Sequence, residues 1–200
     1  MTDAILVALI TGASSITVAT ITVVVKDYLD RRRTRIAKEK DELIAESDVH
    51  EMVVLNDWLN TTRERYHFDR LSIFQFHNGG KFFQGKSMKK FSMTYEAVAP
   101  GYEKIKRGQQ NILCSEYPDW ITSMLKKKCF AHITAEMDHK DRYELDNLGV
   151  KQFVTVPINC LKGNLVGFMV GYNISKVDEK IRDKFVSLVE DSKFVSGYLV

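Results

Sequence analysis

The pattern of apolar and polar residues separates an uncharged N-terminal segment from the rest of the chain. Residues 4–25, AILVALITGASSITVATITVVV, contain no charged side chain. A helix of this length spans about 33 Å at roughly 1.5 Å per residue, which matches a bilayer core of about 30 Å. The residues before it include an acid and no base, and no small-residue cleavage site follows, unlike a cleaved signal peptide. The pattern predicts a transmembrane helix over residues 1–25, with a buried helix of a larger assembly as the alternative.

The next segment is strongly charged. Residues 26–66 contain neither Pro nor Gly, and an apolar side strengthens only beyond Ile44. We therefore expect one long helix or two in tandem. The part over 26–47 is interpreted as a charged juxtamembrane helix and the part over 48–66 as the first helix of a folded domain. Basic residues beside a span mark the cytoplasmic side, which predicts an inner-membrane protein with its N-terminus outside and its folded domain in the cytoplasm. The side chains expected on anionic headgroups, unless they form only a solvated helical face, are Arg31, Arg32, Arg33 and Arg35.

From Leu148 to Tyr172 the pattern alternates as in two strands joined by a turn at Lys162-Gly163-Asn164. Successive side chains of a strand point to opposite faces. In the first strand the predicted faces are Val154, Val156, Ile158 and Cys160 against Phe153, Thr155, Pro157 and Asn159. In the second they are Val166, Phe168, Val170 and Tyr172 against Leu165, Gly167, Met169 and Gly171. Glycine lacks a side chain, so we expect another backbone, a helix or a ligand to approach that face closely.

Further elements precede and follow this hairpin. Residues 69–78 are largely apolar on both faces, which predicts a central strand, and 91–98 predict the next one. A strand or loop is expected near 110–113, and a short strand over 130–134. We also expect a helix capped by Ser115, with Trp120, Ile121 and Leu125 inward, and another that ends at Gly149. A final amphipathic helix, capped by Ser175, is expected to close one side of the sheet or to pair with a second copy.

These residues together resemble a known family. A helix ending in LxxLGV at 145–150, a VPI strand at 156–158, a short turn, the strand LVGFMVGY and an amphipathic helix resemble the closing half of GAF domains. The segment DRLSIFQFHNGG resembles their opening strand. The resemblance covers roughly residues 48–200 and implies an α+β fold with a central antiparallel sheet flanked by N- and C-terminal helices. GAF domains often pair through terminal helices, so the resemblance also implies a homodimer through these helices. Ala4, Ala8 and Gly12, which lie four apart, would let the membrane helices pair as well, with lipid-facing packing as the alternative.

The resemblance also implies a place for a ligand. In GAF domains a ligand, where one is bound, lies between the sheet and the variable loops and short helices. Carried onto this chain, the expected ligand-binding residues are His77, Asn78, Tyr95, Glu96, Phe153, Thr155 and Met169. Their polar groups suit specific hydrogen bonds to a polar ligand. The cysteine that anchors bilin in phytochrome-like members has no counterpart that can be placed here. No cofactor is required, and a filled core that binds nothing is the alternative.

Signals for metal binding and catalysis are weak. His132, Glu136 and His139 match no established spacing of metal ligands. The chain contains no GxSxG, no GxGxxG and no P-loop motif, and nothing brings a nucleophile beside a base. The turn that begins at His77-Asn78 offers only a weak anion-binding nest. Three widely spaced cysteines fit reduced thiols better than disulfides. We therefore expect no enzymatic activity.

Charge bears on the remaining partners. The net charge of +3 is small, so nucleic-acid binding is not expected, although the basic segment 81–90 interleaves lysines with Phe82 and Phe83. The function predicted is a membrane-anchored sensory or ligand-binding module that acts through a separate output protein. The alternative is a structural or scaffolding membrane protein, bacterial or phage, whose GAF-like domain only mediates assembly.

Overall fold

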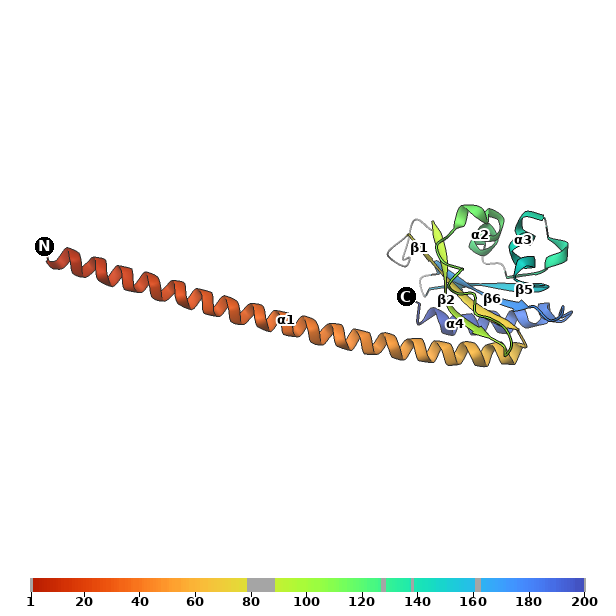
Figure 1. Ribbon diagram of the computed structural model, residues 1–200, viewed down its shortest axis with the longest axis horizontal. Helices are drawn as coiled ribbons and strands as arrows, with labels where there is room; N and C mark the ends of the chain where they lie inside the picture. Colours follow the sequence, from red (N-terminus) through yellow and green to blue (C-terminus); the bar gives the residue numbers. More distant parts are fainter. Residues whose placement is uncertain (1, 79–88, 127–128, 138, 161–162, 200) are drawn as a thin grey trace. The chain divides into compact units, whose positions relative to one another are not determined.

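A computed structural model describes residues 2–78, 89–126, 129–137, 139–160 and 163–199. The side chains of residues 1–24, 43, 45, 47, 139–141, 182 and 185 are outside this description. The chain divides into two units, Met1–His50 and Glu51–Val200. Helix α1, Thr2–Tyr66, makes up the first unit and continues into the second (Figure 1). Residues 26–66, for which one long helix or two in tandem were expected, form one continuous helix.

The first unit consists of the N-terminal part of α1. Its described side chains, which begin at Val25, are exposed to solvent. Arg31 pairs with Asp27 at 2.8 Å and Arg35 with Glu39 at 3.0 Å. Such exposed pairs along one helix contribute little stability, so these guanidinium groups can exchange their partner for another anion at low cost. Over the side chains that are described, we find no helix with both the length and the apolar content needed to cross a bilayer. The span predicted over 4–25 falls on side chains outside that range and stays a prediction.

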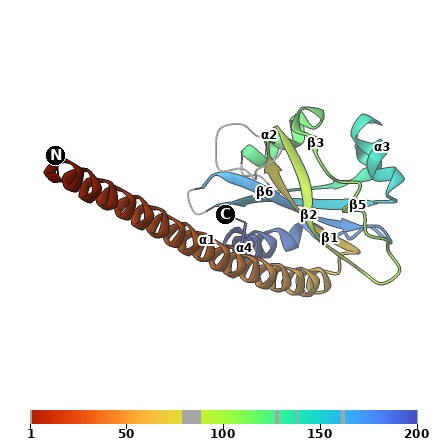
Figure 2. The same cartoon turned by 60° about the vertical axis from the view of Figure 1, so that its left-hand side comes forward.

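The second unit is organised around one antiparallel sheet. Among its described residues six strands lie in the order β3-β2-β1-β6-β5-β4 (Figure 2). The strands are β1 Arg70–His77, β2 Lys90–Val98, β3 Ile112–Leu113, β4 Phe130–Ile133, β5 Gln152–Asn159 and β6 Leu165–Asn173. The predicted antiparallel sheet and the central position of the strand over 69–78 are both confirmed, because β1 lies between β2 and β6.

Helices cover the two faces of this sheet. The short helices are η1 Cys114–Glu116, α2 Pro118–Leu125, η2 Thr134–Glu136, α3 His139–Asn147, η3 Ile181–Lys184 and α4 Phe185–Ser196. The end of α1 and α4 pack on what we call the terminal-helix face, where Leu55, Leu188 and Val154 share one core. Helices α2 and α3 lie over the α2–α3 face, whose core includes Met124 and Phe168. Figure 2 shows the sheet between these two layers. The flanking N- and C-terminal helices are as predicted.

The hairpin of β5 and β6 follows the predicted alternation except at one end. Val154 and Met169 face the terminal helices, whereas Phe153 and Phe168 face α2 and α3, as predicted. The expected faces of Leu165 and Val166 are wrong, because each lies on the opposite side. The reason is a β-bulge: Ile158 pairs with Gly167 but Asn159 pairs with Leu165, which leaves Val166 as an extra residue. Gly163 takes a φ of +78°, as a tight turn requires.

Two glycines of β6 allow the close approach predicted for them. A Cβ at Gly167 would lie 2.2 Å from the carbonyl oxygen of Phe74 on the neighbouring strand. A Cβ at Gly171 would lie 2.6 Å from the ring of Phe68. In both cases the space that a methyl group needs is already occupied, so the packing of β1 and of the Phe68 ring against β6 depends on glycine.

The caps predicted for two helices are wrong. Ser115 lies in η1, and α2 starts at Pro118 without a side-chain cap. Within α2, Trp120 and Ile121 face the core as predicted, but Leu125 is exposed and Met124 is buried in its place. Ser175 does not cap the last helix, because its N–H and hydroxyl both donate to Asp69 Oδ2. The chain instead turns through η3 before α4.

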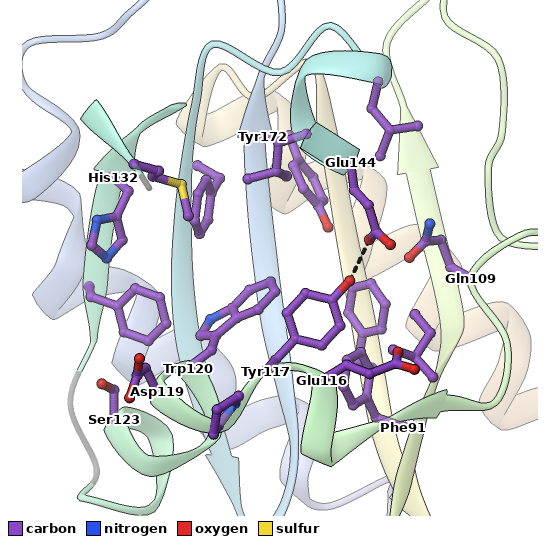
Figure 3. A pocket seen from close by; sticks show the side chains of 18 residues that line it. Phe91, Gln109, Glu116, Tyr117, Asp119, Trp120, Ser123, His132, Glu144 and Tyr172 are labelled. Carbon is purple, nitrogen blue, oxygen red and sulfur yellow. Dashed lines mark hydrogen bonds between the residues drawn. The ribbon is translucent and has the colours of Figure 1, made fainter. Parts of the chain in front are cut away.

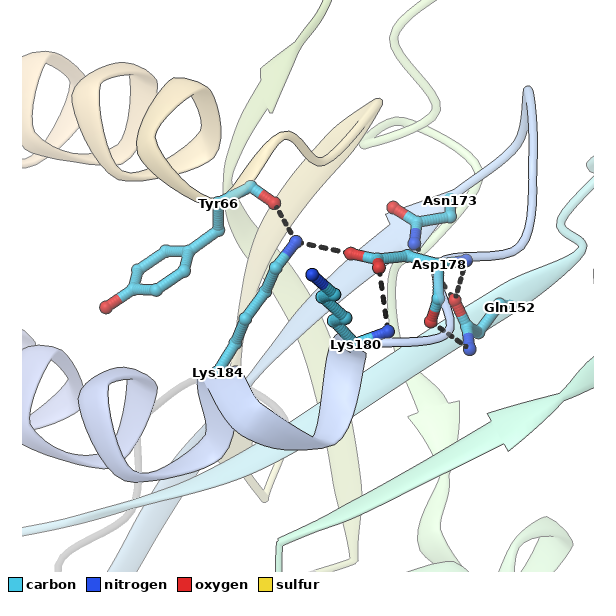
Figure 4. Close-up of polar contacts among 6 residues, drawn as sticks. All are labelled: Tyr66, Gln152, Asn173, Asp178, Lys180 and Lys184. Atoms are coloured by element: carbon cyan, nitrogen blue, oxygen red, sulfur yellow. Dashed lines mark hydrogen bonds and ion pairs between the residues drawn. The ribbon is translucent and has the colours of Figure 1, made fainter.

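A polar network holds this last turn against the end of α1 (Figure 4). Lys184 Nζ donates to the carbonyl oxygen of Tyr66 at 2.7 Å and also pairs with the Asp178 carboxylate. Gln152 Oε1 accepts hydrogen bonds from the Asp178 N–H at 2.8 Å and from Asn173 Nδ2 at 3.0 Å. The network joins α1, both hairpin strands and the start of the closing helix. It therefore fixes where the terminal-helix layer meets the sheet.

A candidate ligand cavity between the sheet and helices α2 and α3

A cavity of about 430 Å³ opens on the α2–α3 face of the sheet (Figure 3). All six described strands contribute lining side chains from below, and η1, α2 and α3 contribute them from above. Ligand sites in proteins usually measure about 300–1,000 Å³ and are mainly apolar with a few polar groups. This cavity has that size and composition. It also lies where the GAF resemblance placed a ligand.

Aromatic rings form most of the cavity wall. Trp120 is central, with its ring centroid 5.6 Å from that of Phe153 and 5.8 Å from that of Tyr117. Phe91 lies edge-on to Tyr117 at 5.9 Å. The indole N–H of Trp120 donates to Thr155 Oγ1 at 3.2 Å. The indole is thus held by tilted and edge-on ring contacts and by one hydrogen bond, and part of its surface lines the cavity.

One hydrogen bond bridges the two helical segments above the cavity. The hydroxyl of Tyr117, at the start of α2, donates to Glu144 Oε2 on α3 (Figure 3). Pro118 follows Tyr117 at the first position of α2, where its missing N–H costs nothing. The bridge links two elements that otherwise approach the sheet separately, so a ligand that moves either segment must change this contact.

The polar part of the lining is acidic. Its carboxylates belong to Glu116, Asp119 and Glu144, and no lysine or arginine is among the described residues that line the cavity. His132 also contributes to the lining. Burial lowers the pKa of His132 below its ordinary value of 6.5, and the nearby Glu136 carboxylate only partly opposes this shift. The histidine is therefore mainly neutral at pH 7 and does not balance the carboxylates.

Three of the predicted ligand-binding residues lie on the α2–α3 face. Phe153 lines the cavity itself. Thr155 is fully buried behind Trp120 and acts on the cavity through that indole. Glu96 is buried and lies 3.0 Å from the Arg70 guanidinium, and its carboxylate accepts the backbone N–H groups of Ile105 and Lys106. It thereby anchors the loop that carries the lining residue Gln109.

The other four predicted residues lie elsewhere. Tyr95 and Met169 belong to the core of the terminal-helix face. His77, at the end of β1, has its Nε2 2.8 Å from Ser92 Oγ. Asn78 accepts the N–H of Lys89 through its side-chain oxygen. The structure therefore does not gather the seven residues into one place.

Several residues that line the cavity were not predicted from the sequence. Tyr117, Glu116, Asp119 and Glu144 line the cavity, but none was predicted to do so. Trp120 was expected to point inward from a helix. That inward orientation was the one sequence signal for the position of the cavity wall. The segment Tyr-Pro-Asp-Trp at the start of α2 places Tyr117 and Trp120 on the cavity side of the helix.

Other chemistry finds little support in the part of the chain that the structure describes. No group of three or more metal-ligating side chains is present among those residues, and the His139 side chain lies outside them. Burial raises the pKa of the Cys114 thiol to about 11 and also raises that of Cys129. Both are therefore thiols rather than reactive thiolates at neutral pH. The basic segment 81–88 is outside the described residues.

Comparison with known proteins identifies the fold. No family model matches the chain, and no curated protein sequence matches it. Solved structures do: the blue-light absorbing form of the Thermosynechococcus elongatus PixJ GAF domain superposes with a TM-score of 0.60 at 16% identity, covering 76% of this chain and 87% of that one. A phycocyanobilin-bound GAF domain of a cyanobacterial phytochrome gives 0.58 at 17%, covering 74% and 85%. A photoproduct-state GAF domain from Synechocystis gives 0.56 at 14%, covering 74% and 94%. The chain therefore contains a domain with the GAF fold.

Proposed function

We propose that this chain is a membrane-anchored sensory module whose GAF-fold domain binds a small molecule and signals through a separate partner protein. The observation that carries the proposal is the cavity of about 430 Å³ on the α2–α3 face. A well-packed core leaves few voids larger than one water molecule, so a space of this size beside aromatic and polar groups favours a ligand. Two of the similar structures hold bilin pigments in their GAF domains. No catalytic role is proposed.

The position of the cavity suggests how binding could be transmitted. The ligand would lie on one face of the sheet, and the terminal helices pack on the other. Phe153 and Val154, neighbours in β5, face the cavity and the terminal helices respectively. A shift of β5 on ligand binding would therefore reach α4, which packs against β5. Because packed cores respond as discrete arrangements, such a small shift can change the helix layer.

Pairing through that helix layer is the form of output that we propose. The end of α1 and α4 lie side by side, with the rings of Trp58 and Phe194 stacked at 5.4 Å. On α4, Phe194 itself remains 39% exposed and Val186 remains 75% exposed. Exposed apolar side chains on one helix favour a protein contact. Val186→Glu is expected to lower the molar mass measured by light scattering to that of a monomer. Val177→Glu, at a 40% exposed valine outside the helices, is the control.

The membrane anchor rests on sequence. We propose that residues 4–25 span the inner membrane and that the following arginines lie at its cytoplasmic surface. Deletion of residues 1–25 is expected to move the protein from the membrane pellet to the soluble fraction. Retention of the deleted form in the pellet, in the presence of high salt, would refute the anchor.

Ligand binding is tested by thermal unfolding of the full-length chain in a mild detergent with a panel of metabolites. A ligand at a hundred times its Kd stabilises the folded state by about 2.7 kcal/mol. Ser123→Trp places an indole in the cavity and should abolish the shift, because Ser123 lines it. Thr122→Trp adds the same side chain at an exposed position of α2 and should keep it. No shift with any compound would favour the alternative, a scaffolding protein that uses its exposed helix layer only for assembly.

A further inference from the structure

The charge of the cavity distinguishes between classes of ligand. Three carboxylates line it, from Glu116, Asp119 and Glu144, in a chain whose net charge is +3. The local charge is therefore opposite to that of the whole protein. Glu144 accepts a hydrogen bond from the hydroxyl of Tyr117.

These three carboxylates are exposed, and they differ from three acids that are buried or half-buried in the domain. Glu96 pairs with Arg70, Asp178 with Lys184, and Asp191 with Arg65. By contrast, no ion pair to any of the three cavity carboxylates exists among the described residues. Glu96, Asp178 and Asp191 thus have cationic partners, whereas the three carboxylates around the cavity have none among the described residues.

The aromatic rings in the cavity wall also favour a cationic ligand. The rings of Trp120 and Tyr117 lie at the centre of the lining, with the three carboxylates around them (Figure 3). The face of an aromatic ring carries negative electrostatic potential, and tryptophan attracts an ammonium group most strongly. Sites that combine several rings with carboxylates are suited to organic cations. An anionic ligand would meet three like charges and no described lysine or arginine in the lining.

On this basis we infer that the cavity binds an organic cation: a small molecule with a flat or apolar body and an ammonium group. The inference rests on the proposed ligand-binding function and adds the class of ligand. The apolar body lies among the rings of Trp120, Phe153 and Phe91, and the ammonium group lies toward Glu144 and Asp119, which are exposed at the outer side of the lining. Binding of the ammonium there leaves the Tyr117–Glu144 bridge as part of the site.

Three indole compounds test the inference, because they share one ring and differ in charge. Tryptamine is a cation, tryptophol is neutral and indole-3-acetate is an anion. Each is titrated by calorimetry into the full-length chain in detergent, with the Ser123→Trp variant as the reference for partition into micelles. We expect tryptamine to bind about tenfold more tightly than tryptophol, the size of a cation–aromatic and carboxylate contribution. Indole-3-acetate is expected to bind more weakly still.

Charge variants then separate the carboxylates from the rings. Glu144→Gln keeps an acceptor for the Tyr117 hydroxyl and, combined with Asp119→Asn, should bring tryptamine to the affinity of tryptophol. Glu190→Gln removes a carboxylate from α4, which packs on the other face of the sheet, and should leave the preference unchanged.

Two results would overturn the inference. Equal or tighter binding of tryptophol or indole-3-acetate by the unmodified chain would refute the charge preference while leaving the cavity as a ligand site. Failure of all three compounds to bind would also overturn it. The metabolite panel then decides separately whether the cavity binds another class of molecule or none.

Discussion

The buried ion pair between Arg70 and Glu96 makes a sharp prediction, because Glu96 was expected from the sequence to contact a ligand. Their side chains are 4% and 1% exposed. Arg70 Nη2 also donates to the carbonyl oxygen of Glu103 at 2.7 Å, and the Glu96 carboxylate accepts two backbone N–H groups at 3.0 and 3.1 Å. The pair therefore ties β1 and β2 to the loop that precedes β3.

Glu96→Gln removes the charge but keeps the shape of the side chain. Removal of one partner leaves the Arg70 guanidinium buried without its counter-ion, which costs about 3–5 kcal/mol. Domains of this size have a total stability of about 5–15 kcal/mol, so the loss is large. It corresponds to a decrease in Tm of roughly 10 °C.

The assay is urea and thermal unfolding followed by circular dichroism, with Glu190→Gln as the matched control. Glu190 forms an exposed pair with Lys193, and its loss should cost less than about 1 kcal/mol. In a double-mutant cycle, Arg70→Met with Glu96→Leu should be less destabilising than the sum of the single changes, by about 1–3 kcal/mol. A loss below about 1 kcal/mol for Glu96→Gln, or simple additivity, would refute the structural role. An unchanged stability together with loss of the ligand-induced thermal shift would instead indicate that Glu96 contacts the ligand, as the sequence predicted.

Three further predictions concern other contacts of the domain. Gly167→Ala should destabilise it by several times the ~1 kcal/mol typical of point substitutions, because a Cβ would lie 2.2 Å from a carbonyl oxygen of β1. Burial acts to raise the pKa of Asp69, but hydrogen bonds donated by residues 174–175 outweigh it and hold that pKa below 3.8. The unfolded state therefore binds the proton more readily, so this contribution to stability is present above about pH 4 and is lost as the pH falls. Thr155→Val removes the acceptor of the Trp120 indole N–H and should lower the affinity of a cavity ligand more than the stability.

Each of these has a measurement that can contradict it. Urea unfolding of Gly167→Ala within 0.5 kcal/mol of the unmodified chain, taken as about the scatter of neutral surface changes, would show that β1 and β6 separate without cost. For Asp69, the difference in unfolding free energy between the chain and Asp69→Asn should shrink between pH 5 and pH 3, and a constant difference would exclude the proposed linkage. For Thr155→Val, the intrinsic fluorescence of Trp120 should change on substitution. An unchanged spectrum and an unchanged ligand affinity would show that the indole hydrogen bond has no role in ligand binding.

The sequence alone was sufficient for those elements whose signal is local. The alternation in β1 and β5, the glycines of β6 and the turn at Gly163 follow from a period of two and from the absence of a Cβ, both of which are properties of neighbouring residues. These patterns also supported the resemblance to GAF domains that the solved structures bear out as a fold. The faces of Leu165 and Val166 were predicted wrongly, because a bulge changes the alternation without changing the composition.

The cavity was decided by tertiary structure. Tyr95 and Glu96 are consecutive in one strand, so they face opposite sides of the sheet and cannot both contact one ligand. Tyr117 and Glu144, which bridge the cavity, are 27 residues apart, and only the packing of α2 and α3 over the same sheet face brings them together. The partner of Glu96 was equally invisible, because Arg70 reaches it from the adjacent strand. Local patterns determine which residues form strands and which are buried, whereas the order of strands and the helices above them determine which side chains share a site.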